Sequence, residues 1–401
     1  MSKKHILLVA PFTSLKGEAY FNRFRYLAQN FVKNGYKVTL ITSDFEHFTK
    51  KHRNNDVEKY KEDYDIYFIH EIGYKKNVSL FRLISHKIFC NNLNNYIKNN
   101  IEKFNIVYSA YPLICSNLVL GKYAKKYNIP LIIDIQDVWP ESISAFLGKY
   151  TKIFSPIIKI FSIRANRAYS YADGLVAVSK TYLERAKKVN FTKYYEVAYI
   201  GADTKKIKNI IPVKKDEKEF WITYIGTLSY SYDIETIIQT ASLLKNYENI
   251  KFFIIGDGQN RDSLKKLNKK IKANVIFLDS MPYEDMISYL KSSDIGLNAI
   301  QSYAIPSITN KISDYICTNT VVLNSSTNYE IVNLIDNNKI GFNYKAGDCK
   351  ELKQKIEFLY NNKNILQIYK KNINYVVNRF DRNIEYKKIY VLIKKILKEK
   401  Q

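Results

Sequence analysis

Short apolar segments alternate with longer amphipathic segments along most of the chain. In the first half, strand-like runs occupy residues 5–10, 37–42, 65–69, 106–109, 131–135 and 173–179. Helical patterns lie between these runs, and the first helix is expected from about Glu18 to Asn34, where Gly35 provides a stop signal. Alternation of this kind predicts an α/β fold with a parallel sheet covered by helices on both faces.

The same alternation restarts in the second half, after a charged segment at 204–219 that is expected to be a linker. Strand-like runs occupy residues 221–228, 250–255, 274–278, 294–298, 321–323 and 341–344. We therefore predict two Rossmann-like domains that face each other across a cleft. The expected ranges are 1–204, 205–375 and, for a final helix that crosses back to the first domain, 376–401.

The stretch at 307–316 carries candidate chemistry at the beginning of a predicted helix. Lys311 stands three residues before Asp314, and the apolar pattern continues through Tyr315 and Ile316. A helix N-terminus offers backbone N–H groups that have no partner within the helix. Together with a cation and a carboxylate, these groups suit a sugar nucleotide, with the amides and lysine binding the diphosphate and the carboxylate binding a ribose diol.

Polar residues also follow the strand at 131–135. Asp137, Trp139 and Glu141 come just after its carboxyl end, where α/β sheets bind ligands. We expect them to line the cleft. The structural alternative is that Asp137 caps a turn and Trp139 anchors a domain interface.

The composition is strongly basic, with 63 Lys and Arg against 38 Asp and Glu and a net charge of +25. Such a charge attracts phosphorylated substrates or anionic lipid, or it reflects a biased composition with solvated lysines. Nucleic acid binding is not expected, because the charge is spread along the chain and no reading motif accompanies it. A helical pattern at 149–171 combines an apolar face with basic flanks, and this face is either ordinary core or a contact with an anionic membrane.

Several other classes are disfavoured. The first βαβ unit lacks GxGxxG, which argues against dinucleotide binding there. Polar residues and Pro112 interrupt the longest uncharged run, 105–121, and no signal peptide precedes the first strand, so a soluble or peripheral protein is expected. Cys90, Cys115, Cys317 and Cys349 show no paired spacing and are expected to be unpaired thiols in a reducing cytoplasm.

Four segments, 134–142, 224–236, 254–258 and 309–315, together form a recognisable pattern. In their order and spacing they resemble the family-4 glycosyltransferases, with the closest likeness to the branch that builds bacterial O-antigen and capsule and includes fucosamine transferases. The resemblance implies a GT-B fold, donor binding mainly by the second domain, acceptor binding by the first, retention of anomeric configuration and no metal. In agreement with the last point, the sequence shows neither a DxD loop nor clustered histidine ligands.

The resemblance also assigns residues. Asp314 would hold the ribose and Lys311 the diphosphate, with Lys311 and Asp137 as the catalytic residues. The other expected donor-binding residues are Gly226, Thr227, Ser229, Gly258, Ser307, Ile308, Thr309 and Asn310. The expected acceptor-binding residues are Gly17, Trp139 and Glu141.

Three positions depart from the family pattern. Pro306 stands where the first glutamate of a pair belongs, which removes a carboxylate contact to the donor sugar. Thr227 and Asp233 replace the usual basic residues after the Gly226 strand, which shifts phosphate neutralisation toward Lys311 and the helix amides. Gln136 takes the place of a histidine and leaves Asp137 as the nearest ionisable group.

The sequence thus predicts a metal-independent, retaining hexosyl- or N-acetylhexosaminyltransferase without a cofactor. It would use a nucleotide-sugar donor, favoured as UDP-linked, and a glycan or polyprenyl-linked acceptor in surface polysaccharide synthesis. Its expected location is the cytoplasm, at the inner face of the membrane. The alternatives are a nucleotide-sugar epimerase of the same fold and a non-catalytic sugar-nucleotide-binding protein.

Overall fold

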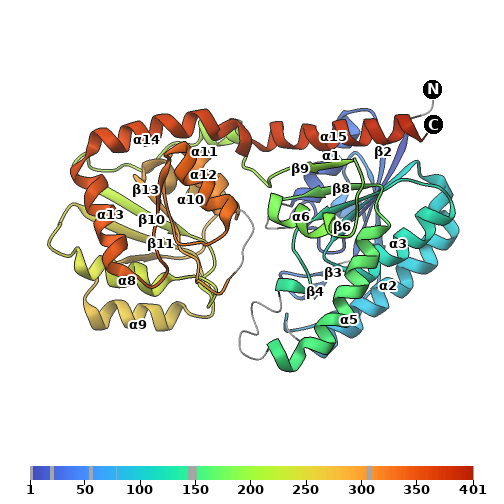
Figure 1. The fold of residues 1–401 in the computed structure, drawn as a ribbon, viewed down its shortest axis with the longest axis horizontal. Coiled ribbons are helices and arrows are strands. Elements are labelled where there is room, and N and C mark those ends of the chain that lie inside the picture. The colour runs from blue at the N-terminus through green and yellow to red at the C-terminus, as the bar shows by residue number, and fades with distance from the viewer. Residues whose placement is uncertain are drawn as a thin grey trace. The chain divides into compact units, whose positions relative to one another are not determined.

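The chain forms two compact units in a computed structural model that describes residues 3–18, 22–53, 57–77, 79–142, 151–304 and 309–400 (Figure 1). Unit 1 comprises Met1–Ala198 together with Tyr386–Gln401. Unit 2 comprises Tyr199–Glu385. Each unit is built on one parallel sheet.

Within the described ranges, the sheet of unit 1 has seven strands in the order β5-β2-β1-β6-β7-β8-β9, and all neighbours pair in parallel. The strands are β1 (His5–Val9), β2 (Lys37–Ser43), β5 (Asp65–Ile69), β6 (Ile106–Tyr111), β7 (Leu131–Ile135), β8 (Gly174–Ala177) and β9 (Tyr195–Val197). A small antiparallel pair, β3 (Phe45–Glu46) with β4 (Lys51–His52), follows β2. The strand order reverses between β1 and β6, which makes the carboxyl ends of these two strands the expected binding edge.

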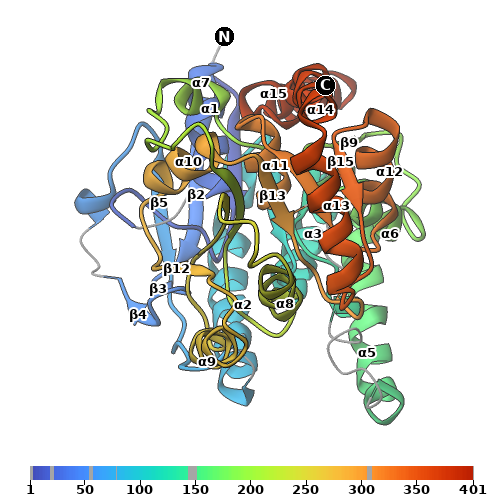
Figure 2. The same ribbon diagram turned by 90° about the vertical axis from the view of Figure 1, so that its left-hand side faces the viewer.

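Helices cover both faces of this sheet, as the alternating pattern predicted. They are α1 (Arg23–Lys33), α2 (Leu80–Asn100), α3 (Ile114–Lys126), α5 (Thr151–Ser170), α6 (Lys180–Lys187) and α15 (Arg382–Glu399), with short 3-10 turns η1 (Val57–Tyr60) and η2 (Ile101–Lys103). α1 and α15 lie together over one face, where Phe31 and Ile393 join Leu8 of β1 in the core. α2, α3 and α5 pack side by side on the other face (Figures 1 and 2).

The first helix begins later than the sequence predicted, at Arg23 and not near Glu18. Asn22 is its N-cap: the side-chain oxygen accepts a hydrogen bond from the Phe24 backbone N–H at 2.9 Å and another from the Thr13 hydroxyl at 2.5 Å. A capping side chain fixes the start of a helix more strongly than the apolar pattern does.

The described part of unit 2 forms a sheet of six parallel strands in the order β12-β11-β10-β13-β14-β15. The strands are β10 (Phe220–Ile225), β11 (Ile250–Ile255), β12 (Ile276–Leu278), β13 (Ile295–Asn298), β14 (Val321–Asn324) and β15 (Gly341–Asn343). Counted along the unit this is the order 3-2-1-4-5-6 of a Rossmann fold, whose ligands bind where the order reverses. In unit 2 that place is the carboxyl ends of β10 and β13.

The helices of unit 2 also form two layers. They are α8 (Ile234–Leu243), α9 (Arg261–Ile271), α10 (Tyr283–Ser292), α11 (Asn310–Cys317), α12 (Tyr329–Asn338), α13 (Cys349–Asn361) and α14 (Lys363–Val376), followed by the 3-10 turn η4 (Val377–Phe380). α8, α9 and α13 pack together on one face, and α10, α11, α12 and α14 lie over the other (Figure 1). The expected α/β fold with two Rossmann-like domains is confirmed.

The segment 204–219 is not the plain linker that its charge suggested. Its first residues form the helix α7 (Thr204–Asn209), capped by the Asp203 carboxylate, which accepts from the Lys206 backbone N–H at 3.1 Å. Ile207 is the buried residue of this helix. A single apolar residue among lysines gave no periodic signal in the sequence.

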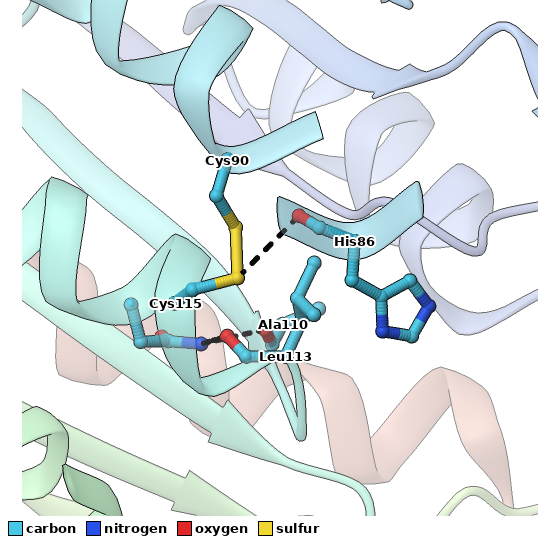
Figure 3. The surroundings of a disulfide bond; sticks show 6 residues. His86, Cys90, Ala110, Leu113 and Cys115 are labelled. Atoms are coloured by element: carbon cyan, nitrogen blue, oxygen red, sulfur yellow. Dashed lines mark hydrogen bonds between the residues drawn. A yellow bond between two sulfur atoms is a disulfide. The ribbon is translucent and has the colours of Figure 1, made fainter. Parts of the chain in front are cut away.

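The expectation that all four cysteines are unpaired thiols is wrong for two of them. Cys90 on α2 and Cys115 on α3 form a disulfide with a Cα–Cα distance of 6.0 Å (Figure 3). Cys317 and Cys349 are free. The two paired residues are 25 positions apart, and only the packing of α2 against α3 brings them together.

The apolar face of α5 is largely on the surface. Ile153, Phe154, Ile157, Ile160 and Ile163 are 42–71% exposed. Its buried side chains are smaller ones nearer its end, Ala165 and Ala168, together with Tyr169. The reading of this face as ordinary core therefore fails. No helix in the described ranges is long and apolar enough to cross a membrane.

Candidate functional site

Glycines shape the loop that follows β10. Gly226 has φ +118°, and a Cβ there would lie 2.6 Å from the Cε of Lys311. A Cβ on Gly256, in the neighbouring loop after β11, would lie 2.0 Å from the Gly226 carbonyl oxygen. The Gly226 N–H donates to Ile255 O at 2.9 Å and joins the two loops. The missing side chain at Gly226 is thus what admits Lys311 to the carboxyl end of β10.

Lys311 is a buried lysine whose partners among the described residues are neutral tyrosines. It is 7% exposed, its ammonium donates to the Tyr224 hydroxyl at 2.7 Å, and it lies 4.2 Å from the Tyr224 ring and 3.5 Å from the Tyr232 ring. Among the described residues no carboxylate forms an ion pair with it. Burial lowers the pKa of Lys311 well below its usual value. Two ring faces compensate only partly for lost hydration, so an anion bound here would complete the site.

Asp314 lies one helical turn further along α11 and has a different partner. Its carboxylate accepts from the Tyr283 hydroxyl of α10 at 2.7 Å and is 8% exposed. Burial raises the pKa of Asp314 to about 6, although the Tyr283 hydrogen bond and the charge of Arg382 act in the opposite direction. Asp314 is therefore an acceptor whose charge is poorly compensated.

The beginning of α11 is well placed for the predicted role. The helix starts at Asn310 after Thr309, whose side chain makes no capping hydrogen bond and instead donates to the Asn298 side-chain oxygen, at the end of β13, at 3.3 Å. α11 thus begins beside the point where the strand order reverses. Ser307 and Ile308, and Pro306 before them, lie outside the described residues.

The remaining donor-side predictions fall on the same loops. The Thr227 carbonyl accepts from the Tyr224 hydroxyl at 2.9 Å, and the Ser229 carbonyl accepts from the Tyr232 N–H at 3.1 Å. Gly258 has φ +159°, and a Cβ there would lie 2.4 Å from the Leu228 carbonyl oxygen. These contacts connect the β10 loop with the two tyrosines that hold Lys311.

Asp233, one of the departures from the family pattern, has a structural role. It is 3% exposed and accepts from the Thr236 hydroxyl and from the Gly347 N–H, both at 2.8 Å. The carboxylate thus joins the start of α8 to the loop before α13. This use explains why an acid is tolerated near an expected phosphate site.

In unit 1, the three residues predicted after β7 are each engaged within the unit. Asp137 accepts from the Val138 N–H at 2.8 Å, which is the turn-capping alternative, and burial raises its pKa. The Trp139 ring packs edge-on against Phe161 of α5 at 5.5 Å. Glu141 forms an ion pair with Arg185, while its Oε2 is buried without a hydrogen-bond partner in the described part of the chain.

The sequence predicts Asp137 as the ionisable group nearest to Gln136, but the Gln136 side chain hydrogen bonds to Asp134. Its amide donates to the buried carboxylate of Asp134 at 3.0 Å. Asp134 in turn pairs with Arg23 at 2.8 Å and accepts from the Tyr108 hydroxyl at 2.6 Å. No local motif marks this network, because its members come from three elements. Gly17, at φ +83° in the loop after β1, is exposed and has open space where a Cβ would lie.

The structure thus gathers the described donor-side residues at one edge of unit 2 and adds tyrosines that sequence reasoning missed. Tyr224, Tyr232 and Tyr283 supply the hydroxyls and rings around Lys311 and Asp314. The one available signal was Tyr224 itself, a polar side chain two residues before Gly226 at the end of an apolar strand.

Two family models match consecutive parts of the chain. Residues 22–206 match the model described as Glycosyltransferase Family 4, and residues 205–376 match the model described as Glycosyl transferases group 1. The chain belongs to the family-4 glycosyltransferases. No curated protein matches its sequence.

Solved structures similar to this glycosyltransferase have the GT-B fold. HepE of Anabaena, in complex with UDP, has a TM-score of 0.67 at 14% identity, with 98% of this chain and 100% of that one covered. WaaG, a glycosyltransferase involved in lipopolysaccharide biosynthesis, has a TM-score of 0.66 at 12% identity over 96% and 98% of the two chains. A putative UDP-N-acetylglucosamine 2-epimerase from Listeria monocytogenes has 0.58 at 12% over 99% and 98%. At these identities the likeness establishes the fold alone.

Proposed function

We propose that the protein is a retaining, metal-independent glycosyltransferase that moves a hexosyl or N-acetylhexosaminyl group from a UDP-sugar to a lipid-linked glycan. The observation that carries this proposal is Lys311, a buried lysine that has no carboxylate partner among the described residues and lies at the point where the strand order of unit 2 reverses. The glycosyltransferase family matches support sugar transfer, and HepE, a protein of the same fold, has been solved with UDP-glucose.

The donor diphosphate would bind at the loop after β10 and the start of α11. Its negative charge would supply the anion that Lys311 lacks, and backbone N–H groups at the helix N-terminus would bind further phosphate oxygens. Asp314 and the Tyr283 hydroxyl beside it would bind the ribose diol. These groups of the protein would then neutralise the charge of the diphosphate, which a divalent metal ion does in metal-dependent enzymes.

In the transfer step, the bond between the anomeric carbon and the diphosphate oxygen breaks while an acceptor hydroxyl forms the new bond on the same face. The leaving phosphate takes the hydroxyl proton. Lys311 stabilises the charge that develops on the diphosphate, so its contribution is larger in the transition state than in the ground state. On the acceptor side we assign Asp137 to the reacting centre and Gly17, Trp139 and Glu141 to acceptor binding.

The acceptor is proposed to be membrane-bound because α5 fits an anionic lipid surface. Its exposed isoleucines and Phe154 share the helix with Lys159, Arg164 and Arg167. An apolar face with basic flanks combines insertion between headgroups with attraction to anionic lipid. We therefore propose the inner face of the cytoplasmic membrane as the location of the enzyme and a surface polysaccharide, such as O-antigen or capsule, as its product.

The decisive experiment incubates the purified protein with radiolabelled UDP-sugars, with and without a polyprenyl-diphosphate-linked glycan, in EDTA. Transfer of label to the lipid only when acceptor is present supports the proposal. Conversion of the donor to its epimer without acceptor would replace it with the epimerase function. Binding of UDP-sugar without any turnover, with GDP- and dTDP-sugars also inert, would leave a non-catalytic binding protein. The sequence disfavours the epimerase, since all five histidines precede residue 87 and unit 2 has none.

A further inference from the structure

A cluster of three metal-ligating side chains lies in unit 1, apart from any residue used above. Asp44 follows β2, His52 ends β4, and His70 follows β5. One ligand atom from each lies within 4.8 Å of the others. The Asp44 Oδ2 to His70 Nδ1 distance is 2.6 Å, and the Asp44 Oδ1 to His52 Nδ1 distance is 3.6 Å.

We propose that Asp44, His52 and His70 bind one divalent first-row transition metal ion, such as Zn²⁺ or Co²⁺. One carboxylate and two imidazoles form a borderline nitrogen and oxygen donor set that such ions prefer over Mg²⁺ or Ca²⁺. In a tetrahedral site with bonds of about 2.0–2.2 Å, ligand atoms lie roughly 3.4 Å apart. The cluster reaches this spacing through small rotations of its exposed rings, because the His52 and His70 side chains are 45% and 61% exposed.

The surroundings of the cluster orient its ligands. The Glu71 N–H donates to Asp44 Oδ1 at 3.1 Å and holds the carboxylate in place. His52 Nε2 lies 3.4 Å from the Ile72 carbonyl oxygen, so this nitrogen is the N–H donor of the ring and Nδ1 is free for a metal. Such a contact between the second ring nitrogen and a carbonyl is the usual support of a metal-binding histidine.

The His52 ring packs against a neighbouring aromatic ring on one side. The Phe45 ring, its partner across the β3–β4 pair, contacts it edge-on at 5.3 Å. A Cβ on Gly73 would lie 2.6 Å from the Phe45 ring and 3.3 Å from His52 Nε2, so the bare glycine leaves room for both rings. The nearby cation Arg53 is neutralised by the Glu18 carboxylate at 2.7 and 2.8 Å. The charge of Arg53 is therefore compensated and does not by itself oppose a bound cation.

A metal here would join three separate segments. β2 and β5 are neighbours in the sheet, and the β3–β4 pair carries His52 over their carboxyl ends. The ion would fix this hairpin to the sheet edge and leave at least one coordination position for water. Because the site lies in unit 1 and Lys311 lies in unit 2, this inference does not rest on the proposed sugar transfer.

The test is a cobalt titration of the full-length protein after chelator treatment and removal of any affinity tag. We expect one equivalent of Co²⁺ with visible d–d absorption, displaced by Zn²⁺, and a Zn²⁺-dependent rise in Tm. His52→Ala and His70→Ala should each weaken binding by more than about 100-fold, since removal of even a supporting group costs 10–100-fold.

His5→Gln is the matched control, because His5 is a histidine of the same unit that hydrogen bonds to Thr39 outside the cluster. It should keep full cobalt binding. Melting curves in EDTA establish that each variant is folded. We expect both histidine variants to fold, because the His52 and His70 side chains are exposed. The proposal is overturned if the folded wild-type protein binds no cobalt. It is also overturned if the His52→Ala and His70→Ala variants bind cobalt with the same affinity as the wild type.

Discussion

Replacement of Asp314 by asparagine should stabilise unit 2 and weaken donor binding at the same time. The carboxylate is buried, its pKa is raised from 3.8 to about 6, and it accepts a hydrogen bond from the Tyr283 hydroxyl. The side-chain oxygen of asparagine can accept that same bond. The substitution therefore removes the cost of burying a charge and keeps the contact.

The sign of the effect follows from the direction of the shift. Between pH 4 and 6 the unfolded chain has lost the proton of Asp314 while the folded protein still binds it, so the free energy of unfolding falls as pH rises through this window. A shift of about two pKa units corresponds to about 3 kcal/mol. The gain from Asp314→Asn should thus be near zero below pH 4 and approach about 3 kcal/mol above pH 7.

Urea unfolding followed by Trp221 fluorescence measures this gain in unit 2, in a Trp139→Phe background because the chain has two tryptophans. Asp262→Asn, on the exposed surface of α9, is the matched control and should change stability by less than about 0.5 kcal/mol. The same Asp314→Asn variant should bind UDP about 10- to 100-fold more weakly, because it loses a hydrogen bond between a charged carboxylate and the ribose. A variant that is less stable than wild type at pH 7.5 would refute the reasoning.

Three further changes probe the other parts of the account. Lys311→Ala should lower kcat/KM for transfer by about 10²–10³-fold, the effect of losing one preorganised electrostatic contact, and near-normal turnover would remove Lys311 from the reaction. Gly226→Ala should weaken UDP binding in a calorimetric titration, because the added Cβ would displace Lys311. The control Gly347→Ala has a similar positive φ but open space for a Cβ, so it should only lower Tm, and equal UDP affinity in the two variants would contradict the role of Gly226 in admitting Lys311. The double variant Ile157→Glu with Ile160→Glu should no longer sediment with anionic vesicles, whereas the control Ile368→Glu, at a 50% exposed position on α14, should still do so. Retained vesicle binding by the double variant would exclude α5 as the lipid contact.

The strands and the order of elements were predictable because their signals are local. The run at 250–255, for example, is β11 without change. The start of α1 was not predictable from periodicity, because it depends on the Asn22 cap, whose side chain accepts a hydrogen bond from Thr13.

The chemistry of the site was predictable only in part. Lys311 and Asp314 could be chosen from their spacing on a helix, but their tyrosine partners come from β10, α10 and the loop before α8. The same limit applies to Cys90 with Cys115 and to Asp44 with His52 and His70, whose spacings of 25, 8 and 18 residues match no motif. Long-range packing, which a single sequence does not display, decides these contacts.

The central claim is that Lys311 binds the diphosphate of a nucleotide-sugar donor. Calorimetric titration of UDP into the wild-type protein, Lys311→Met and Lys345→Met tests it without an acceptor. Lys345 is an exposed lysine of the same unit, so its variant should bind UDP as the wild type does. Lys311→Met should bind UDP about 10- to 100-fold more weakly, with uridine unaffected. Equal UDP affinity in the wild type and Lys311→Met would contradict the account.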